Sequence, residues 1–235
     1  SGTLNIFKAA VQNKVKRVIF AASSSTYGNE ESLPKVEGVI GKPLSPYAVT
    51  KLVNELYAEV FANTYNFEFV GLRYFNVFGP KQDPHGAYAA VIPLFMKAAV
   101  EGKSPTINGD GTFSRDFTYV ANAVQANIKS LFISPNNRPL SSVQREPSTV
   151  ILPPSNLNQI YNVACGDRTN LNELWNYICK AANIDVKPNY GPNRTGDIPH
   201  SLASIEKANG MIGYDPDVKV KQGIEKTYEW FVKGG

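Results

Sequence analysis

The chain has few of the residues that define disulfide-rich, metal-binding or nucleic-acid-binding proteins. Its 235 residues include two cysteines and two histidines, and the net charge is +4. Cys165 and Cys179 are too far apart for a CxxC pair, so we expect no disulfide framework and no metal site. The densest basic cluster is KVKR, which offers little to a nucleic acid or a membrane surface.

The sequence also lacks an initiator methionine and a visible targeting segment. SGTLNIFKAAVQ has the apolar spacing of a helix already under way, so we expect the chain to be cut from a longer protein. With 43% hydrophobic and 19% charged residues, the composition is that of a globular protein with room for two lobes.

Short apolar runs alternate with amphipathic helices along the chain. VKRVIFAAS and QIYNVACG predict strands buried on both faces, and FEFVGLRYFNVFG predicts a strand followed by a loop. Helices are expected over 87–100 and 120–132, and NLNE predicts a helix start capped by Asn170 and Glu173. This alternation predicts an α/β fold with a doubly wound parallel sheet, whose ligands sit at the carboxyl ends of the strands.

A serine cluster and a tyrosine-lysine pair are the chemically most suggestive features. SSSTYG follows the first strand, and Ser45-Pro46 then predicts a capped helix start. In that helix Tyr47, Lys51 and Glu55 lie four apart on one line. A separate apolar stripe is formed by Val49, Leu52, Val53, Leu56, Tyr57, Val60 and Phe61.

The spacing of Tyr47 and Lys51 suits a proton relay. A phenol has a pKa of about 10, so a tyrosine base near neutrality needs the phenolate stabilised by roughly 4 kcal/mol. A lysine ammonium one helical turn away and an oxidised nicotinamide would together supply much of that stabilisation. A serine hydroxyl can donate to and accept from the same substrate oxygen.

Six motifs in order give the chain a family resemblance. SSSTYG, SPYAVTK, LRYFNVFGP, SRDFTYV, YNVACG and RTGDIPHSLAS resemble the extended short-chain dehydrogenase/reductase family, in particular its UDP-sugar 4-epimerases and most closely the UDP-N-acetylglucosamine 4-epimerases. The resemblance implies a Rossmann-like fold whose N-terminal half is missing, including the glycine-rich turn for the cofactor pyrophosphate. It implies that residues 1–80, with parts of 116–170, complete a dinucleotide-binding domain, and that 81–115 and 171–235 form a smaller mixed substrate domain. The segment 134–158 is proline-rich and polar without a period, which predicts a surface insertion.

The resemblance also implies catalytic roles. Tyr47 would take the proton from the sugar 4-hydroxyl while hydride passes to NAD, and the 4-keto sugar would then receive the hydride on its other face. Lys51 would hold the nicotinamide ribose, and Ser23, with Ser24 beside it, would contact the sugar. Phe75 would border the nicotinamide.

Substrate contacts follow from the same resemblance. Asn76, Arg115 and Arg194 would bind the diphosphate, for which the planar guanidinium is well suited. Ala90 and Val91 would line the nucleotide-sugar pocket. Ser201 would lie beside the sugar 2-substituent, where its small side chain leaves room for an N-acetyl group.

The resemblance implies a cytoplasmic homodimer, joined through a four-helix bundle that includes the Tyr47 helix, with a role in nucleotide-sugar metabolism and polysaccharide biosynthesis. Two alternatives remain. A dehydratase or decarboxylase of the same family would need a carboxylate near the catalytic hydroxyl, but no acid follows Ser23 until Glu30. A non-catalytic nucleotide-sugar-binding protein would have no use for Ser23, Tyr47 and Lys51 together. The isolated chain is expected to be inactive without the rest of the cofactor-binding half.

Overall fold

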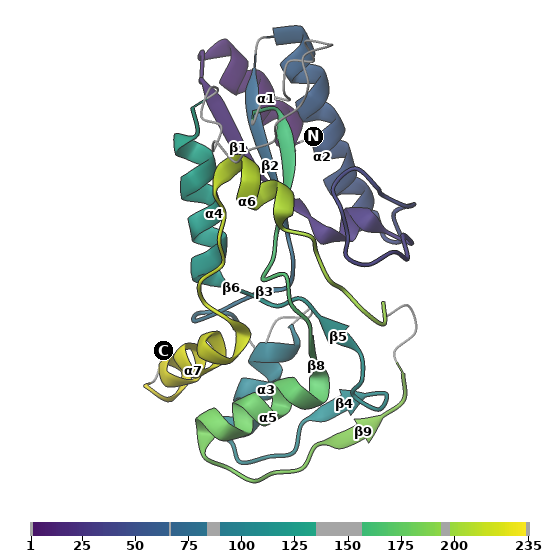
Figure 1. The fold of residues 1–235 in the computed structure, drawn as a ribbon, viewed down its shortest axis with the longest axis vertical. Coiled ribbons are helices and arrows are strands. Elements are labelled where there is room, and N and C mark those ends of the chain that lie inside the picture. Colours follow the sequence, from purple (N-terminus) through teal and green to yellow (C-terminus); the bar gives the residue numbers. More distant parts are fainter. Residues whose placement is uncertain (1, 66, 84–89, 135–156, 194–197, 234–235) are drawn as a thin grey trace, which may run out of the picture. The chain divides into compact units, whose positions relative to one another are not determined.

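Parallel strands β1 (Arg17–Ser23), β2 (Glu68–Tyr74) and β7 (Gln159–Val163) form a sheet in the order β1-β2-β7 (Figure 1). The computed structural model describes residues 2–65, 67–83, 90–134, 157–193 and 198–233. The sheet belongs to the first of two units, which consists of Ser1–Tyr74, Val124–Val163 and Ser204–Asp215. The second unit consists of Phe75–Ala123, Ala164–Ala203 and Pro216–Gly235.

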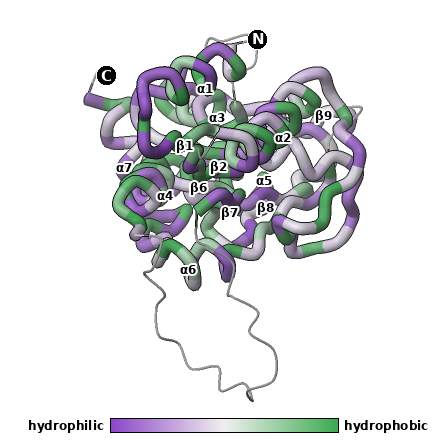
Figure 2. The backbone as a smooth tube through the Cα atoms, turned by 90° about the horizontal axis from the view of Figure 1, so that it is seen from above, coloured by the Kyte–Doolittle hydropathy of each residue, from purple (hydrophilic) through white to green (hydrophobic). Residues whose placement is uncertain are grey.

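Helices α1 (Gly2–Gln12) and α2 (Pro46–Tyr65) pack on one face of the sheet. They meet in a cluster of aromatic rings. The centroid of the Phe7 ring lies 5.2 to 5.7 Å from the ring centroids of Phe20, Phe61 and Phe67. Gly71 makes this packing close, because a Cβ there would lie 2.4 Å from Ile160 and 2.8 Å from the Phe20 ring. β1 and β2 are drawn largely in the green of hydrophobic residues in Figure 2.

The other face of the sheet is covered by α4 (Val120–Phe132), from Val124 onward, and by α6 (Glu206–Ile212). Arg17 donates to the carbonyls of Ser130 and Leu131 in α4. Lys207 of α6 donates to the carbonyl of Ile160 in β7 at 2.9 Å. Helix α6 therefore packs with the sheet, whereas the sequence assigned all of 171–235 to the substrate domain.

The buried side of α2 differs from the predicted apolar stripe. The residues buried against the rest of the unit are Ala48, Glu55, Ala58 and Phe61. Most of the predicted stripe is exposed: Val49 by 47%, Val53 by 36%, Leu56 by 51% and Val60 by 57%. Small alanines let the helix approach the sheet closely, and Glu55 is buried because it is paired with a cation from β2.

Strand β1 is less buried than its apolar sequence predicts. Ala22 and Ser23 are buried, but Arg17 to Phe20 are only half-buried and Ala21 is exposed. The reason is its position, because within the described residues β1 pairs with β2 alone and forms an edge of the sheet.

Among its described residues, the second unit is built from short strands and helices. Strand pairs are β3 (Val77–Phe78) with β6 (Thr118–Tyr119), β4 (Thr106–Asn108) with β9 (Asn189–Gly191), and β5 (Ser114–Arg115) with β8 (Thr169–Asn170). Helices α3 (Val91–Val100), α5 (Leu171–Ala182) and α7 (Val220–Val232) share one core, in which the rings of Phe95 and Trp175 are 5.6 Å apart.

Several local predictions are confirmed. Ser45 Oγ accepts from the backbone N–H of Ala48 at the start of α2, and the capping box between Asn170 and Glu173 starts α5. The helix predicted over 87–100 is described from Val91, and residues 87–89 lie outside the described residues, as does most of the predicted insertion over 134–158. None of the helices in the described ranges has the length and apolarity to cross a bilayer.

A buried carboxylate joins three segments of the second unit. Asp116 is fully buried and accepts hydrogen bonds from the backbone N–H groups of Cys165, Gly166 and Ala203 at 2.8 to 3.2 Å. Burial nevertheless raises the pKa of Asp116 to about 7, because removal from water disfavours the charge more than the three donors favour it.

We expect Asp116 to lower the stability of the folded chain as the pH rises. The folded chain holds this proton up to a pKa of about 7, whereas the unfolded chain releases it near its ordinary value of about 4. The free energy of unfolding should therefore fall across that window, by up to about 4 kcal/mol. Urea unfolding at pH 5 and pH 8 measures the effect.

The control compares Asp116→Asn with Asp217→Asn, which changes an exposed aspartate of the same unit. Asp116→Asn should remove this part of the pH dependence and lower stability most at pH 5. Parallel pH curves for the parent and Asp116→Asn would contradict the assignment.

Candidate active site

Ser23 ends β1 and shapes the turn that follows it. Its Oγ accepts from the backbone N–H of Ser25 at 3.1 Å, and the Ser25 hydroxyl lies 2.9 Å from the same oxygen. These contacts cap the 3-10 turn η1 (Ser24–Tyr27), in which Ser24 is half-buried. The serine predicted to be catalytic is thus fixed at the carboxyl end of a strand, where an α/β sheet presents its ligands.

Tyr47 and Lys51 lie one turn apart at the start of α2. The Lys51 ammonium is 5.6 Å from the centroid of the Tyr47 ring and donates to the carbonyl of Ala21 at 2.8 Å. Ala21 precedes Ser23 by two residues, so Lys51 links the tyrosine to the end of β1. The Tyr47 side chain is 57% exposed, which leaves its hydroxyl open to a ligand.

Within the described residues, Lys51 forms no ion pair with a carboxylate. The ion pairs found among the described residues join other cations to carboxylates. An ammonium carries three donors, so Lys51 can donate to a ligand hydroxyl in addition to the Ala21 carbonyl. The first unit therefore brings together three of the predicted catalytic groups.

The second unit has a cavity of about 540 Å³, a size suited to a small-molecule ligand. Four residues predicted to bind substrate line it: Asn76, Ala90, Val91 and Arg115. Ala90 and Val91 lie at the start of α3, where Ala90 is the N-cap. These residues come from three separate segments of the sequence, and the fold gathers them around one space.

The polar residues of this cavity are held by the backbone around them. Asn76 adopts a positive φ of 37°, which asparagine tolerates better than most residues, and its amide donates to the Asp116 carbonyl at 3.0 Å. Arg115 donates to the carbonyls of Ser114 and Pro199 at 3.0 and 3.2 Å. Both side chains are thus oriented before any ligand arrives.

The remaining predicted residues have different surroundings. Ser201 is half-buried and its N–H donates to the Ser114 carbonyl, so it lies beside β5 but is not among the described residues that line the cavity. Phe75 is buried in the second unit with 1% exposure. Arg194 lies outside the described residues.

Sequence reasoning missed part of the cavity wall. Thr106 and Asn108 of β4, together with Phe113 and Phe117, also line the space. The available signal was the alternation in β4, where buried Ile107 lies between two exposed polar residues. That pattern predicts a strand with one solvated face, but it does not indicate what the face borders.

Comparison with known proteins places this geometry in context. The solved UDP-N-acetylglucosamine 4-epimerase from Methanobrevibacter ruminantium M1, in complex with UDP-N-acetylmuramic acid, is 37% identical and has a TM-score of 0.85 over 99% of this chain and 68% of that chain. The UDP-glucose 4-epimerase of Mycolicibacterium smegmatis is 31% identical over 231 residues, which is 98% of this chain and 67% of the relative. This chain thus spans about two thirds of the length of these relatives.

The relatives are not uniform in activity. The UDP-N-acetyl-alpha-D-glucosaminuronate decarboxylase of Bacillus cytotoxicus is 30% identical over 235 residues, which is 98% of this chain and 68% of the relative.

The likeness to the solved structure confirms the predicted α/β Rossmann-like fold with a parallel sheet. The family model described as "NAD dependent epimerase/dehydratase family" matches residues 1–135, which is more than half of the chain. NAD as the cofactor of the predicted family is confirmed by that description. Together with the relatives, this match shows that the chain belongs to the NAD dependent epimerase/dehydratase family.

Proposed function

We propose that this chain takes part in the 4-epimerisation of UDP-sugars, with UDP-N-acetylglucosamine and UDP-N-acetylgalactosamine as the substrate pair. The observation that carries the proposal is the position of the Lys51 ammonium, 5.6 Å from the exposed Tyr47 ring and hydrogen-bonded to the end of β1. This arrangement supports the proposal because it places a cation beside the phenol that would exchange a proton with a sugar hydroxyl.

The residues of the first unit fit the predicted proton chemistry. NAD, when bound, supplies a hydride acceptor and donor at C4 of the sugar. Tyr47 takes the proton of the sugar 4-hydroxyl and later returns it, while Lys51 favours the phenolate and donates to the cofactor ribose. Ser23 and Ser24 hold the sugar oxygen through hydroxyls that both donate and accept.

The cavity of the second unit suits the nucleotide part of the substrate. Arg115 offers a planar fork of donors to a diphosphate, and Asn76 adds an amide donor. The apolar side of the wall, with Ala90 and Val91, fits a base or a ribose. Arg194 and Phe75 keep the roles that the family resemblance implies, as a diphosphate ligand and a neighbour of the nicotinamide.

A dehydratase or decarboxylase is the second candidate, because a decarboxylase is among the relatives. Both activities require an acid near the catalytic hydroxyl, whereas Ser24, Ser25 and Thr26 follow Ser23 here. Epimerisation leaves the mass of the sugar unchanged, and the other two reactions lower it. Mass spectrometry of the product therefore separates the candidates. Binding of UDP-sugar without transient cofactor reduction would favour a non-catalytic role.

We predict that Tyr47→Phe in the full-length protein abolishes turnover and leaves UDP-sugar affinity nearly unchanged. The substitution keeps the ring and removes only the hydroxyl that exchanges the proton. Turnover and calorimetric binding measure the two effects. Tyr65→Phe is the matched control, because Tyr65 is on the same helix and is 54% exposed. More than a few percent residual activity in Tyr47→Phe would refute the role of the phenol.

Ser201→Tyr should impair N-acetylated substrates selectively. A tyrosine ring beside the sugar 2-substituent would occupy the space of an N-acetyl group, and overpacking of this kind is strongly disfavoured. The kcat/KM ratio for acetylated over non-acetylated UDP-sugars should fall at least about tenfold, the discrimination that one misfitting group provides. Ser201→Ala, which adds no bulk, should keep the parental ratio. Equal loss on both sugar types would show that Ser201 does not border this substituent.

We also propose that α2 joins a second copy of the chain. Four of its apolar residues form one exposed face of the helix, and Ile6 of α1 is 62% exposed. The residues of that face are Val49, Val53, Leu56 and Val60.

Val53→Asp should shift sedimentation toward the monomer, because it would bury a charge in the interface. The matched control is Asn54→Asp, which introduces the same charge at a half-buried position of the same helix that lies off that face, and it should leave the dimer intact. A monomeric parent would refute the proposal.

A further inference from the structure

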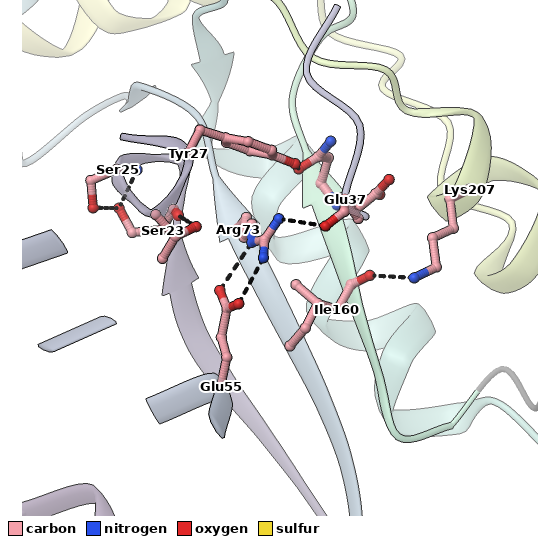
Figure 3. A network of polar contacts seen from close by, with 10 residues as sticks. Ser23, Ser25, Tyr27, Glu37, Glu55, Arg73, Ile160 and Lys207 are labelled. Atoms are coloured by element: carbon pink, nitrogen blue, oxygen red, sulfur yellow. Dashed lines mark hydrogen bonds and ion pairs between the residues drawn. The ribbon is translucent and has the colours of Figure 1, made fainter. Parts of the chain in front are cut away.

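A buried ion pair connects α2 to the centre of the sheet, one turn after the predicted catalytic lysine. Arg73 of β2 donates to Glu55 of α2 through Nε at 3.0 Å and through Nη2 at 2.7 Å. The two side chains are 4% and 5% exposed. Both carboxylate oxygens are engaged, as the dashed lines in Figure 3 show.

The Arg73 guanidinium is fixed from two further directions. Its Nη1 donates to the Glu37 carbonyl at 3.0 Å, and its central carbon lies 4.8 Å from the centroid of the Tyr27 ring. The Tyr27 hydroxyl in turn donates to Asn162 of β7 at 2.7 Å. Burial opposes the charge of Arg73, but the Glu55 carboxylate outweighs burial and raises the pKa of the guanidinium.

Glu55 follows Lys51 by four residues, so the two side chains extend from the same side of α2. Oppositely charged residues at this spacing normally attract each other. Here Lys51 instead contacts Ala21, while Arg73, which lies opposite Ala22 in the sheet register, binds Glu55. Lys51 and Arg73 therefore bind at neighbouring positions along the sheet, and each has its own partner.

We propose that Arg73 is a positioning residue for the catalytic lysine: by holding both oxygens of Glu55, it keeps that carboxylate off Lys51. Lys51 then stays on the end of β1 and beside Tyr47. The effect on turnover rests on the proposed epimerase activity. The change of the Glu55 partner from Arg73 to Lys51, expected when Arg73 is removed, does not.

The other charged groups nearby do not take over this role. Lys207 of α6 lines the same small cavity as Glu55, but its ammonium donates to Ile160 and lies 5.2 Å from the Tyr161 ring. Glu37 and Glu59 also line that cavity and add negative charge. Without Arg73, the cation that shares the helix side with Glu55 is Lys51.

The first test measures the coupling of Lys51 and Glu55 by urea unfolding. Lys51→Met and Glu55→Gln are made singly and together, in the parent and in Arg73→Met. With Arg73 present, the effects should add to within about twofold in the unfolding equilibrium constant. In Arg73→Met, they should deviate from additivity by at least about fivefold, because Lys51 then pairs with Glu55. Additivity in both backgrounds would overturn the proposal.

A substitution that leaves Glu55 buried without a partner risks unfolding. Arg73→Lys therefore serves as a second background, because it keeps the charge but loses the two-pronged contact. It should give a coupling between those of the parent and Arg73→Met. If Arg73→Met does not fold, a coupling in Arg73→Lys no larger than in the parent overturns the proposal.

The second test measures turnover of the full-length protein per folded molecule. Arg73→Met should lower kcat at least about tenfold with little change in KM for the UDP-sugar, the loss expected when an opposite charge no longer favours the phenolate. Adding Glu55→Gln should restore most of kcat, because no carboxylate then competes for Lys51.

An unchanged kcat in Arg73→Met despite a measured coupling would overturn the positioning role. If the coupling of Lys51 and Glu55 rises from the parent to Arg73→Met but the parent does not epimerise UDP-sugars, the proposed function is refuted. The exchange of the Glu55 partner from Arg73 to Lys51 would still stand.

Discussion

The pairing of Arg73 with Glu55 determines how α2 meets the sheet. A carboxylate on the sheet side of a helix is costly to bury unless a cation reaches it with good geometry, and the planar fork of arginine satisfies both of its oxygens. The small residues Ala48 and Ala58 on the same side allow close approach. Once α2 is held in this way, its first turn lies near the end of β1, where Lys51 reaches the Ala21 carbonyl.

Both units use buried polar groups to fix loops that apolar packing alone would leave undefined. In the first unit, Asn162 accepts from Tyr27 and donates to the carbonyls of Lys35 and Ser204. In the second unit, Asp116 gathers three backbone N–H groups, and its own carbonyl accepts from Asn76. Buried groups that are fully hydrogen-bonded give such segments one arrangement, since each alternative leaves a partner unsatisfied.

Local signals predicted most elements correctly, because their causes are local. The cap at Ser45, the capping box at Asn170 and the positions of the strand segments follow from residues close together in the sequence. The apolar stripe of α2 was interpreted less well. Its periodicity reports that a face is apolar, but not whether the sheet or the solvent lies against that face in this chain.

The candidate site likewise has features that neighbouring residues set and features that tertiary contacts set. The sequence by itself determined that Tyr47 and Lys51 share a helix face and that Ser23 ends a strand, because a helical turn and the end of an apolar run are set by neighbouring residues. Only the tertiary structure decided that Lys51 reaches Ala21, that Glu55 is occupied by Arg73, and that Asn76, Arg115 and the start of α3 surround one cavity. Those contacts join residues far apart in the chain, and they depend on which partners the packing of strands and helices brings within hydrogen-bonding distance.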